Sequence, residues 1–181
     1  MRSPIIPLLP LFCLAALPAG AMTLKSTDIR EGEPMDKVFS FNGFGCSGEN
    51  RSPQLSWQSL PAGTQSVAIT AYDPDAPTGS GWWHWLVINL PASVQQLAAG
   101  AGESDATLPA GARHMRTDYG QYTWGGPHPP AGHGPHRYQF TVFALDVPAL
   151  DLPAEVSAAV VGFNLNAHAL AKATLTGLYE R

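Results

Sequence analysis

The sequence predicts a mainly β protein, an antiparallel β-sandwich with one helix appended near its C-terminus. Three observations support this fold class. Glycine and proline are abundant, at 18 and 17 of 181 residues, which is typical of short strands joined by tight loops. Several segments alternate in polarity with the two-residue period of a strand. One late segment has an approximate helical stripe. The length is that of one domain with a sizeable core.

Residues 1–21 are predicted to be a secretory signal peptide. Arg2 is the only charge in this segment, residues 5–17 are almost wholly apolar, and residues 19–21 form a small-x-small cleavage site. The segment is too short to be a membrane anchor. We therefore expect a periplasmic or secreted protein with no membrane span, whose single domain covers residues 22–181.

Charge and cysteine content narrow the class of protein. The formal net charge is −4, with no basic stripe, so nucleic acid is a poor candidate partner. Removal of the signal peptide leaves Cys46 as the only cysteine, so no internal disulfide is expected. Cys46 is expected to be buried and inert.

Short strands and turns are predicted in the first half of the domain. A short strand over 38–41 leads into a glycine-rich loop, and apolar alternation resumes over 55–57. Residues 66–72 form the first clear strand and residues 83–90 the next. By alternation, His84 shares a face with Leu86 and Ile88.

Loops, one strong strand and the helix are predicted in the second half. Residues 93–111 read as a loop with a helical turn over 94–99. Residues 136–146 form the clearest strand, with His136 and Tyr138 on the same face. A helix is expected over 154–171, followed by a short strand over 174–179. Its apolar stripe is Val156, Val160, Phe163, Leu165 and Leu170.

The corner Asp73-Pro74-Asp75-Ala76-Pro77 between the two central strands is the first functional candidate. Proline fixes φ and removes a donor, so this segment is neither helix nor central strand. We interpret it as a rigid turn that aims two carboxylates in fixed directions. His84 follows closely, at the start of the next strand, where a pocket could form at the end of the sheet.

Two pairs of motifs resemble the phosphatidylethanolamine-binding protein family, also called Raf kinase inhibitor-like proteins, and especially its bacterial branch. The pairs are Asp73-Pro74-Asp75-Ala76-Pro77 with Trp83-His84-Trp85, and Gly126-Pro127-His128-Pro129-Pro130 with Gly134-Pro135-His136-Arg137-Tyr138. Segments at 46–57 and 168–179 look like the ends of the same domain. The resemblance covers essentially the whole domain.

The resemblance implies an antiparallel Greek-key β-sandwich with a small anion pocket at one end. Family members bind phosphate-like groups, phosphorylated head groups or small carboxylates there, and relatives are associated with kinase and protease inhibition. One departure is His128, where many bacterial relatives carry Cys. Carried over by position, the pocket residues would be Asp73, Asp75, His84, His136 and Tyr138, with Pro129 and Pro130 as a wall.

The residue types suit an anion. Both histidine rings and the Tyr138 hydroxyl can donate hydrogen bonds to oxygens. We expect Asp73 and Asp75 to stand behind the histidines, fix their tautomers and raise their pKa, so that binding weakens as pH rises through the histidine pKa. Alternatively, the pocket could bind the ammonium group of an ethanolamine-type ligand next to its phosphate, and nearby aromatic faces could stabilise that cation. Rim candidates are Trp82, Trp83, Tyr122, His128 and His168.

We expect a binding protein rather than an enzyme, with no cofactor and no native metal. The imidazoles at 128, 133 and 136 lie in a Pro/Gly loop without the spacing of a strong zinc site, and no serine lies in Gly-x-Ser-x-Gly. Three alternatives stay open: a module that inhibits a protease or kinase, a weak metal-dependent hydrolase, and incidental binding of a purification metal. A protein partner and a homodimer also stay open.

Overall fold

A computed structural model describes residues 20–181. The expected signal peptide therefore lies outside the described residues, apart from its last two positions. Across the described part of the chain, no helix is long and apolar enough to cross a membrane.

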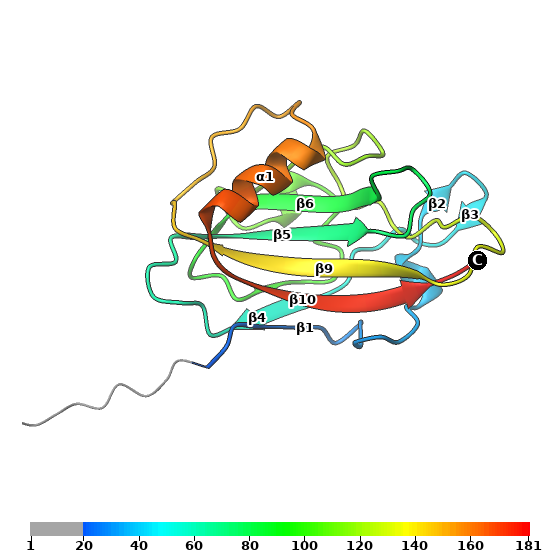
Figure 1. Cartoon of the computed structure of the whole chain (residues 1–181), viewed down its shortest axis with the longest axis horizontal. Helices are drawn as coiled ribbons and strands as arrows, with labels where there is room; N and C mark the ends of the chain where they lie inside the picture. The colour runs from blue at the N-terminus through cyan, green and yellow to red at the C-terminus, as the bar shows by residue number, and fades with distance from the viewer. Residues whose placement is uncertain (1–19) are drawn as a thin grey trace, which may run out of the picture.

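A five-stranded antiparallel sheet forms the centre of the molecule, in the order β10-β9-β5-β6-β8 (Figure 1). Its long inner strands come from segments rich in β-branched and aromatic residues, which fit a pleated surface covered on both sides. The strands are β5 (Ser66–Asp73), β6 (Trp82–Pro91), β8 (Arg113–His114), β9 (His136–Leu145) and β10 (Ala169–Tyr179).

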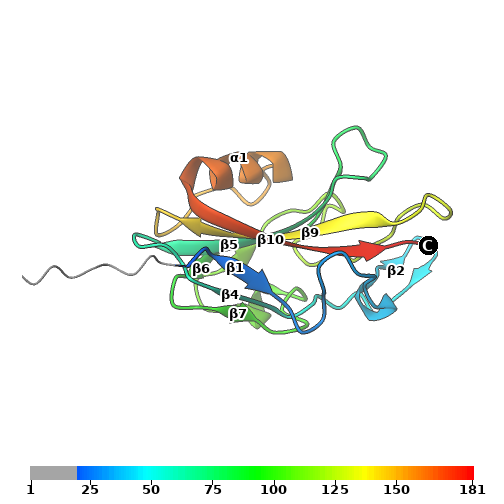
Figure 2. The ribbon, with the colours of Figure 1, turned by 60° about the horizontal axis from the view of Figure 1, so that its bottom comes forward.

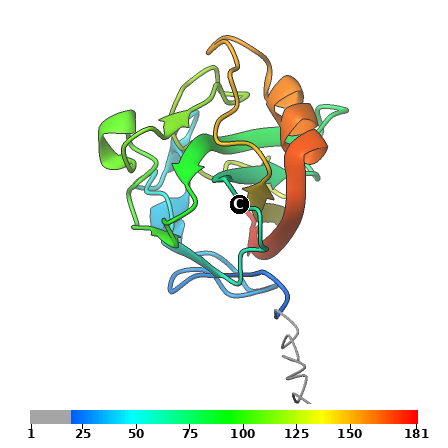
Figure 3. The same cartoon turned by 90° about the vertical axis from the view of Figure 1, so that its left-hand side faces the viewer.

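A smaller sheet covers one face of this sheet, and the helix covers the other (Figure 2). The end-on view separates the helix from the N-terminal strand in the same way (Figure 3). The small sheet consists of β1 (Thr23–Lys25), β4 (Leu55–Gln58) and β7 (Gln96–Leu97), in the order β1-β4-β7. A separate hairpin pairs β2 (Asn42–Gly43) with β3 (Cys46–Ser47). The predicted antiparallel sandwich with one helix is therefore confirmed.

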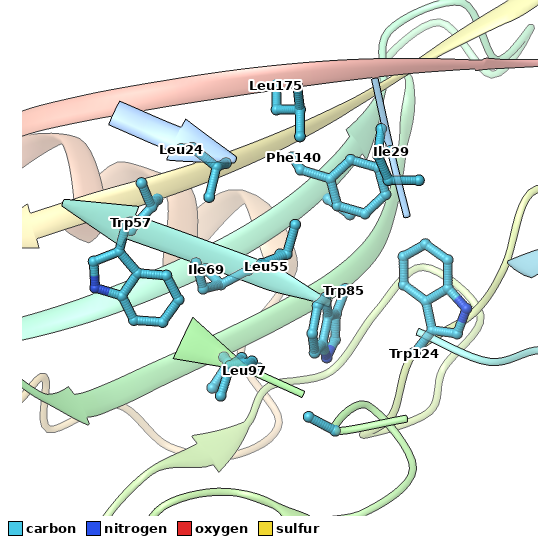
Figure 4. Close-up of a cluster of buried hydrophobic side chains, with 14 of the residues drawn as sticks. Leu24, Ile29, Leu55, Trp57, Ile69, Trp85, Leu97, Trp124, Phe140 and Leu175 are labelled. Carbon is cyan, nitrogen blue, oxygen red and sulfur yellow. The ribbon is translucent and has the colours of Figure 1, made fainter. Parts of the chain in front are cut away.

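Two apolar clusters hold these layers together. The larger one lies between the two sheets, where large aromatic and aliphatic side chains interlock (Figure 4). Its fully buried members include Trp57, Trp85, Trp124 and Phe140. The smaller cluster lies between the five-stranded sheet and the helix and includes Leu86, Ile88 and Leu165. Burial of this surface at about 25 cal/mol per Å² is the main stabilising term.

The helix differs from the predicted one. Helix α1 covers Ala158–His168 only, and its N-cap Ser157 accepts a hydrogen bond from the Val160 amide. The residues after it form the 11-residue strand β10, because they pair along the whole of β9. The predicted stripe was wrong in part: Leu165 is buried as expected, but Val160, Phe163 and Leu170 are not. The small residues Ala158 and Gly162 face the sheet with Val161 and Leu165, whereas Val160 and Phe163 are exposed.

Two shorter segments also differ from expectation. Residues 37–39 form a 3-10 turn rather than a strand, because the Asp36 carboxylate caps the Val38 amide. The expected helical turn over 94–99 contains β7, which pairs with β4. A further 3-10 turn covers Asp105–Thr107.

A β-bulge in β6 changes the direction of His84. Ala71 pairs with Trp85 and Tyr72 pairs with Trp83, so His84 is the extra residue in the ladder. A bulge re-aims side chains and adds local twist. The predicted alternation, which put His84 on the face of Leu86 and Ile88, was therefore wrong. His84 instead lies against Tyr138, with the two ring centroids 5.1 Å apart.

Candidate functional site

A cavity of about 420 Å³ opens at the end of the sandwich where β5 ends and β6 and β9 begin. In Figure 1 this is the end that holds the β2–β3 hairpin and the C-terminus. Side chains from these three strands and from four loop segments line it. The lining residues are Phe44, Asp73, Ala76, Pro77, Thr78, Trp82, His84, Asp118, Tyr119, His128, Pro129, Pro130, His136 and Tyr138.

Asp73 is buried at the C-terminal end of β5 and organises its surroundings. Alternation along β5 puts it on the inner face, together with Ile69 and Ala71. Its Oδ1 accepts the backbone amides of Asp75 at 2.8 Å and Ala76 at 3.1 Å, which closes the turn. Its Oδ2 lies 2.7 Å from His136 Nδ1. Asp73 therefore fixes the orientation of His136.

His136 uses both ring nitrogens within the protein. Nδ1 donates to Asp73, because a carboxylate can only accept, and Nε2 lies 2.8 Å from Nδ1 of His133. His133 itself is exposed. His136 is thus held between a buried acid and a surface imidazole, although its ring still lines the cavity.

His84 is buried and bound to a backbone carbonyl. Its Nδ1 lies 2.6 Å from Gly125 O, and the Gly125 amide donates back to His84 O at 2.9 Å. Burial lowers the pKa of His84 to about 4, and this outweighs the carbonyl groups and the charge of Asp73. The expectation of a charged His84 with a raised pKa was therefore wrong. The ring is neutral near pH 7, and no carboxylate bonds to it.

Two residues that line the cavity each carry a buried donor with no partner among residues 20–181. The Tyr138 hydroxyl is fully buried and unbonded, and the same holds for Nε1 of Trp82. Burial, followed by the charge of Asp73, raises the pKa of Tyr138, so its hydroxyl stays protonated. Buried polar groups are almost always hydrogen-bonded. Three polar atoms away from the cavity, on Trp57, Trp85 and His114, are unpartnered as well.

Asp75 does not line the cavity, contrary to its predicted place there. Its carboxylate forms a bidentate pair with Arg137, at 2.9 Å to Nε and 2.7 Å to Nη2, and accepts the Arg137 amide at 2.9 Å. Hydrogen bonding to Arg137 lowers the pKa of Asp75 to about 2. The pair ties the β5–β6 turn to the start of β9, so Asp75 has a structural role.

The rim candidates divide in two. Trp82 and His128 line the cavity, whereas Trp83, Tyr122 and His168 do not. Trp83 packs on Tyr72 with ring centroids 4.6 Å apart, on the strand face that α1 covers. His168 lies 2.9 Å from the Asp146 carboxylate at the end of α1. Tyr122 is exposed outside the cavity.

Several lining residues were not predicted. Phe44 forms the tip of the β2–β3 hairpin with φ +51° and is 79% exposed at the mouth of the cavity. Asp118 and Tyr119 come from a polar, aromatic segment that carries no motif. Asp118 accepts the Trp83 amide at 2.8 Å, and Tyr119 donates to Gly126 O at 3.0 Å. Of these residues, only Phe44 could have been found from the sequence, because it lies in an Asn-Gly-Phe-Gly segment that is typical of a hairpin turn.

Cys46 differs from its expected state. It is partly exposed and bonds to His128 Nδ1 beside the cavity, with Arg181 Nη1 3.6 Å from its sulfur. Burial and the charge of Arg181 lower the pKa of His128. No group of three or more His, Cys, Asp or Glu side chains is arranged to hold a metal ion within residues 20–181.

Comparison with known proteins gives one consistent family. The family model described as "Phosphatidylethanolamine-binding protein" matches residues 25–180. UPF0098 protein YbcL of Escherichia coli is 45% identical over 181 residues, 99% of each chain. UPF0098 protein YbhB of the same organism is 48% identical over 159 residues, 88% of this chain and 100% of its own.

A solved structure and a mycobacterial protein extend the comparison. The crystal structure of E. coli YbcL, described as "a new member of the mammalian PEBP family", superposes with a TM-score of 0.87 at 47% identity, over 90% of this chain and 99% of its own. A Mycobacterium tuberculosis protein named "Putative lipoprotein LppC" is 35% identical over 170 residues, 92% of this chain and 77% of its own.

Proposed function

Because the chain belongs to the phosphatidylethanolamine-binding protein family, we propose that its cavity binds a small ligand bearing a phosphate or carboxylate group, such as a phosphorylated head group. The observation that carries this proposal is the cavity at the end of the sandwich, which is lined by His84, His136 and Tyr138. Imidazole and phenol groups can donate hydrogen bonds to ligand oxygens.

The rest of the cavity supports a small ligand with an apolar part. A volume of about 420 Å³ lies in the range of small-molecule sites. The apolar part of the lining includes Phe44, Pro77, Pro129 and Pro130. These side chains would contact carbon atoms of the ligand.

Binding rather than catalysis is the activity we propose. Both ring nitrogens of His136 are bonded within the protein, and His84 has only Nε2 free. No hydroxyl or thiol lies within hydrogen-bond distance of His84 among the described side chains. His84 and His136 are thus not paired with a nucleophile, and the thiol–imidazole contact beside the cavity is that of Cys46 with His128.

We also propose that the protein acts in the cell envelope. The predicted cleavage after Ala21 supports this location, as does the likeness to a protein named as a lipoprotein. Fractionation of cells that express the full chain, with N-terminal sequencing of the product, tests this part. We expect the mature protein to begin at Met22 and to appear outside the cytoplasm. An uncleaved cytoplasmic product would contradict it.

Calorimetric titration tests the binding function. Glycerol 3-phosphate, phosphoethanolamine and small carboxylates are titrated into wild type and into Tyr138→Phe. We expect at least one ligand to bind wild type and to lose about tenfold in affinity in the variant. Tyr122→Phe, which changes an exposed tyrosine outside the cavity, is the matched control. Equal affinity in wild type and Tyr138→Phe would remove the proposed site.

A further inference from the structure

We propose that Cys46, in contact with His128 and Arg181 beside the cavity, is a site of thiol–disulfide exchange at which one half of a small-molecule disulfide becomes bonded to the protein. This site is independent of the binding function proposed above, because the thiol does not itself line the cavity. Its reactivity follows from the imidazole on the thiol, the guanidinium next to it, the partial exposure of the sulfur and the room beside it.

The imidazole of His128 can take the proton of the thiol. Its Nδ1 is in hydrogen-bond contact with Cys46 Sγ. Burial and the charge of Arg181 lower the pKa of His128, so the ring is neutral near pH 7 and offers a nitrogen lone pair. A thiol in contact with a neutral base is the arrangement of an activated cysteine nucleophile.

Arg181 brings a positive charge next to the sulfur. Its Nη1 lies 3.6 Å from Cys46 Sγ, and its Nε donates to Pro129 O at 3.1 Å, which holds the guanidinium in place. Within residues 20–181, Arg181 forms no salt bridge with a carboxylate side chain. A cation without an acidic partner stabilises the thiolate, which is the species that attacks a disulfide.

The exposure of Cys46 is that of a reactive thiol rather than a structural one. The residue lies in β3 of the β2–β3 hairpin and is partly exposed. Structural cysteines are buried among apolar groups and are inert, whereas reactive cysteines are partly exposed and lie beside cationic groups. A contact with His128 that served packing alone would not require an accessible sulfur.

The cavity gives an incoming disulfide room beside the thiol. The His128 ring borders both, because it contacts Cys46 and also lines the cavity of about 420 Å³. Phe44, whose ring centroid lies 6.1 Å from that of His128, and Pro129 belong to the same lining. These apolar side chains can contact the carbon atoms of a small disulfide.

The exchange needs no oxidant or reductant besides the disulfide itself. The proton of Cys46 passes to His128 Nδ1, the sulfur bonds to one sulfur of the disulfide, and the bond between the two disulfide sulfurs breaks. The departing thiolate takes the proton from His128. The products are a mixed disulfide on Cys46 and one free thiol, so the Cys46 sulfur is oxidised and the departing sulfur is reduced.

Reaction rates of the mature protein, in which Cys46 is the only cysteine, test the site. The probes are dithiobis(nitrobenzoate), followed by absorbance, and glutathione disulfide, followed by the mass of the intact protein. The matched control is Cys46→Ser combined with Ser47→Cys, which moves the thiol to an exposed position on the opposite face of β3. We expect wild type to react with each probe at pH 7 at least tenfold faster than the control thiol.

Variants of the two neighbours test the cause of the reactivity. His128→Gln keeps a hydrogen-bonding side chain but removes the base, and it should slow the reaction at least tenfold, whereas Arg181→Gln should slow it at least threefold. His168→Gln changes a histidine that bonds to Asp146 outside the cavity, and it should leave the rate unchanged within twofold. Added imidazole should speed the reaction of His128→Ala at least threefold, which a purely structural role of His128 would not allow.

Three results would overturn the proposal. The first is a wild-type rate no higher than that of the control thiol. The second is a fast reaction that both His128→Gln and Arg181→Gln leave unchanged, because the thiol would then react without its neighbours. The third is reaction with dithiobis(nitrobenzoate) but not with glutathione disulfide, because the thiol would then respond only to an activated aromatic reagent.

Discussion

At the scale of residues, the cavity keeps polar atoms that the fold does not use. The Tyr138 hydroxyl is the clearest case, because it is fully buried without a partner. An unsatisfied buried group costs about 1–3 kcal/mol of folding free energy. Residues that lower stability in the free protein are typical of functional sites, where a ligand supplies the missing contact.

Tyr138→Phe should therefore stabilise the free protein. Removal of the unbonded hydroxyl is expected to raise the free energy of unfolding by about 1 kcal/mol, because the ring keeps its packing. Denaturant unfolding in a ligand-free buffer measures this difference. A variant that is less stable than wild type by a similar amount would show that the hydroxyl has a partner, such as an ordered water, in the free protein.

The lowered pKa of Asp75 predicts that the protein loses stability in acid. Its hydrogen bonds to Arg137 lower its pKa from an ordinary 3.8 to about 2 in the folded protein. The stabilisation is thus present above pH 4 and is lost as pH falls toward 2. In Asp75→Asn the melting temperature should fall less than in wild type between pH 4 and pH 2. Thermal melts at several pH values measure it, and parallel curves for the two proteins would contradict this role.

Alternation predicted that His136 and Tyr138 share a face, and the family resemblance placed them with Asp73 in the site. Asp73 ends one strand and His136 and Tyr138 begin another, so their inward faces meet. His84 was predicted in the site but on the wrong face of its strand. The bulge that turns His84 arises from the pairing of β6 with β5, and the local sequence does not indicate it. The position of Asp75 depends on Arg137, 62 residues away, and no local pattern indicates that contact.

At the scale of elements, the loop over residues 124–127 holds the site in place. It holds His84 through Gly125 and docks on the segment at 39–50 through close backbone contact. The Gly126 amide donates to the Asn50 side chain at 2.7 Å, and the Phe41 amide donates to Pro127 O at 3.0 Å. The tautomer of His84 therefore depends on this docking.

Gly126→Ala should break the docking. A Cβ at this position would lie 2.2 Å from the carbonyl oxygen of Phe39, a backbone atom that cannot move aside cheaply. We expect a loss of about 3 kcal/mol in unfolding free energy, together with weaker ligand binding. Gly132→Ala is the control. It has open space around the new methyl group and a φ of +74°, so it should lose only about 1 kcal/mol. Equal losses in both variants would contradict the role of close packing.

The helix shows why element boundaries were harder to predict than strands. Its apolar residues lie on several faces, and its buried face uses Ala158 and Gly162, which carry little hydrophobic signal. Close approach to the sheet selects these small residues, since a Cβ on Gly162 would lie 3.3 Å from the Trp83 ring. Such a fit depends on tertiary contact and cannot be read from periodicity.

At the scale of the whole molecule, no disulfide among residues 20–181 stabilises the sandwich. Cys46 is the only cysteine in residues 20–181 and is free. Addition of a reducing agent should therefore leave the melting temperature of the mature protein unchanged within about 1 °C, since no disulfide restricts the unfolded chain. Calorimetric scans with and without the agent measure this. A clear fall in melting temperature would indicate a bridge between chains through Cys46.

The central claim is that the cavity beside Tyr138 and His84 holds a phosphate group. A crystal structure of the mature protein soaked with methyl phosphate at pH 5.5 tests it most directly. The account predicts phosphate density inside the cavity that is lined by His84, His136 and Tyr138. An empty cavity at a saturating concentration, or phosphate bound only elsewhere on the protein, would contradict it.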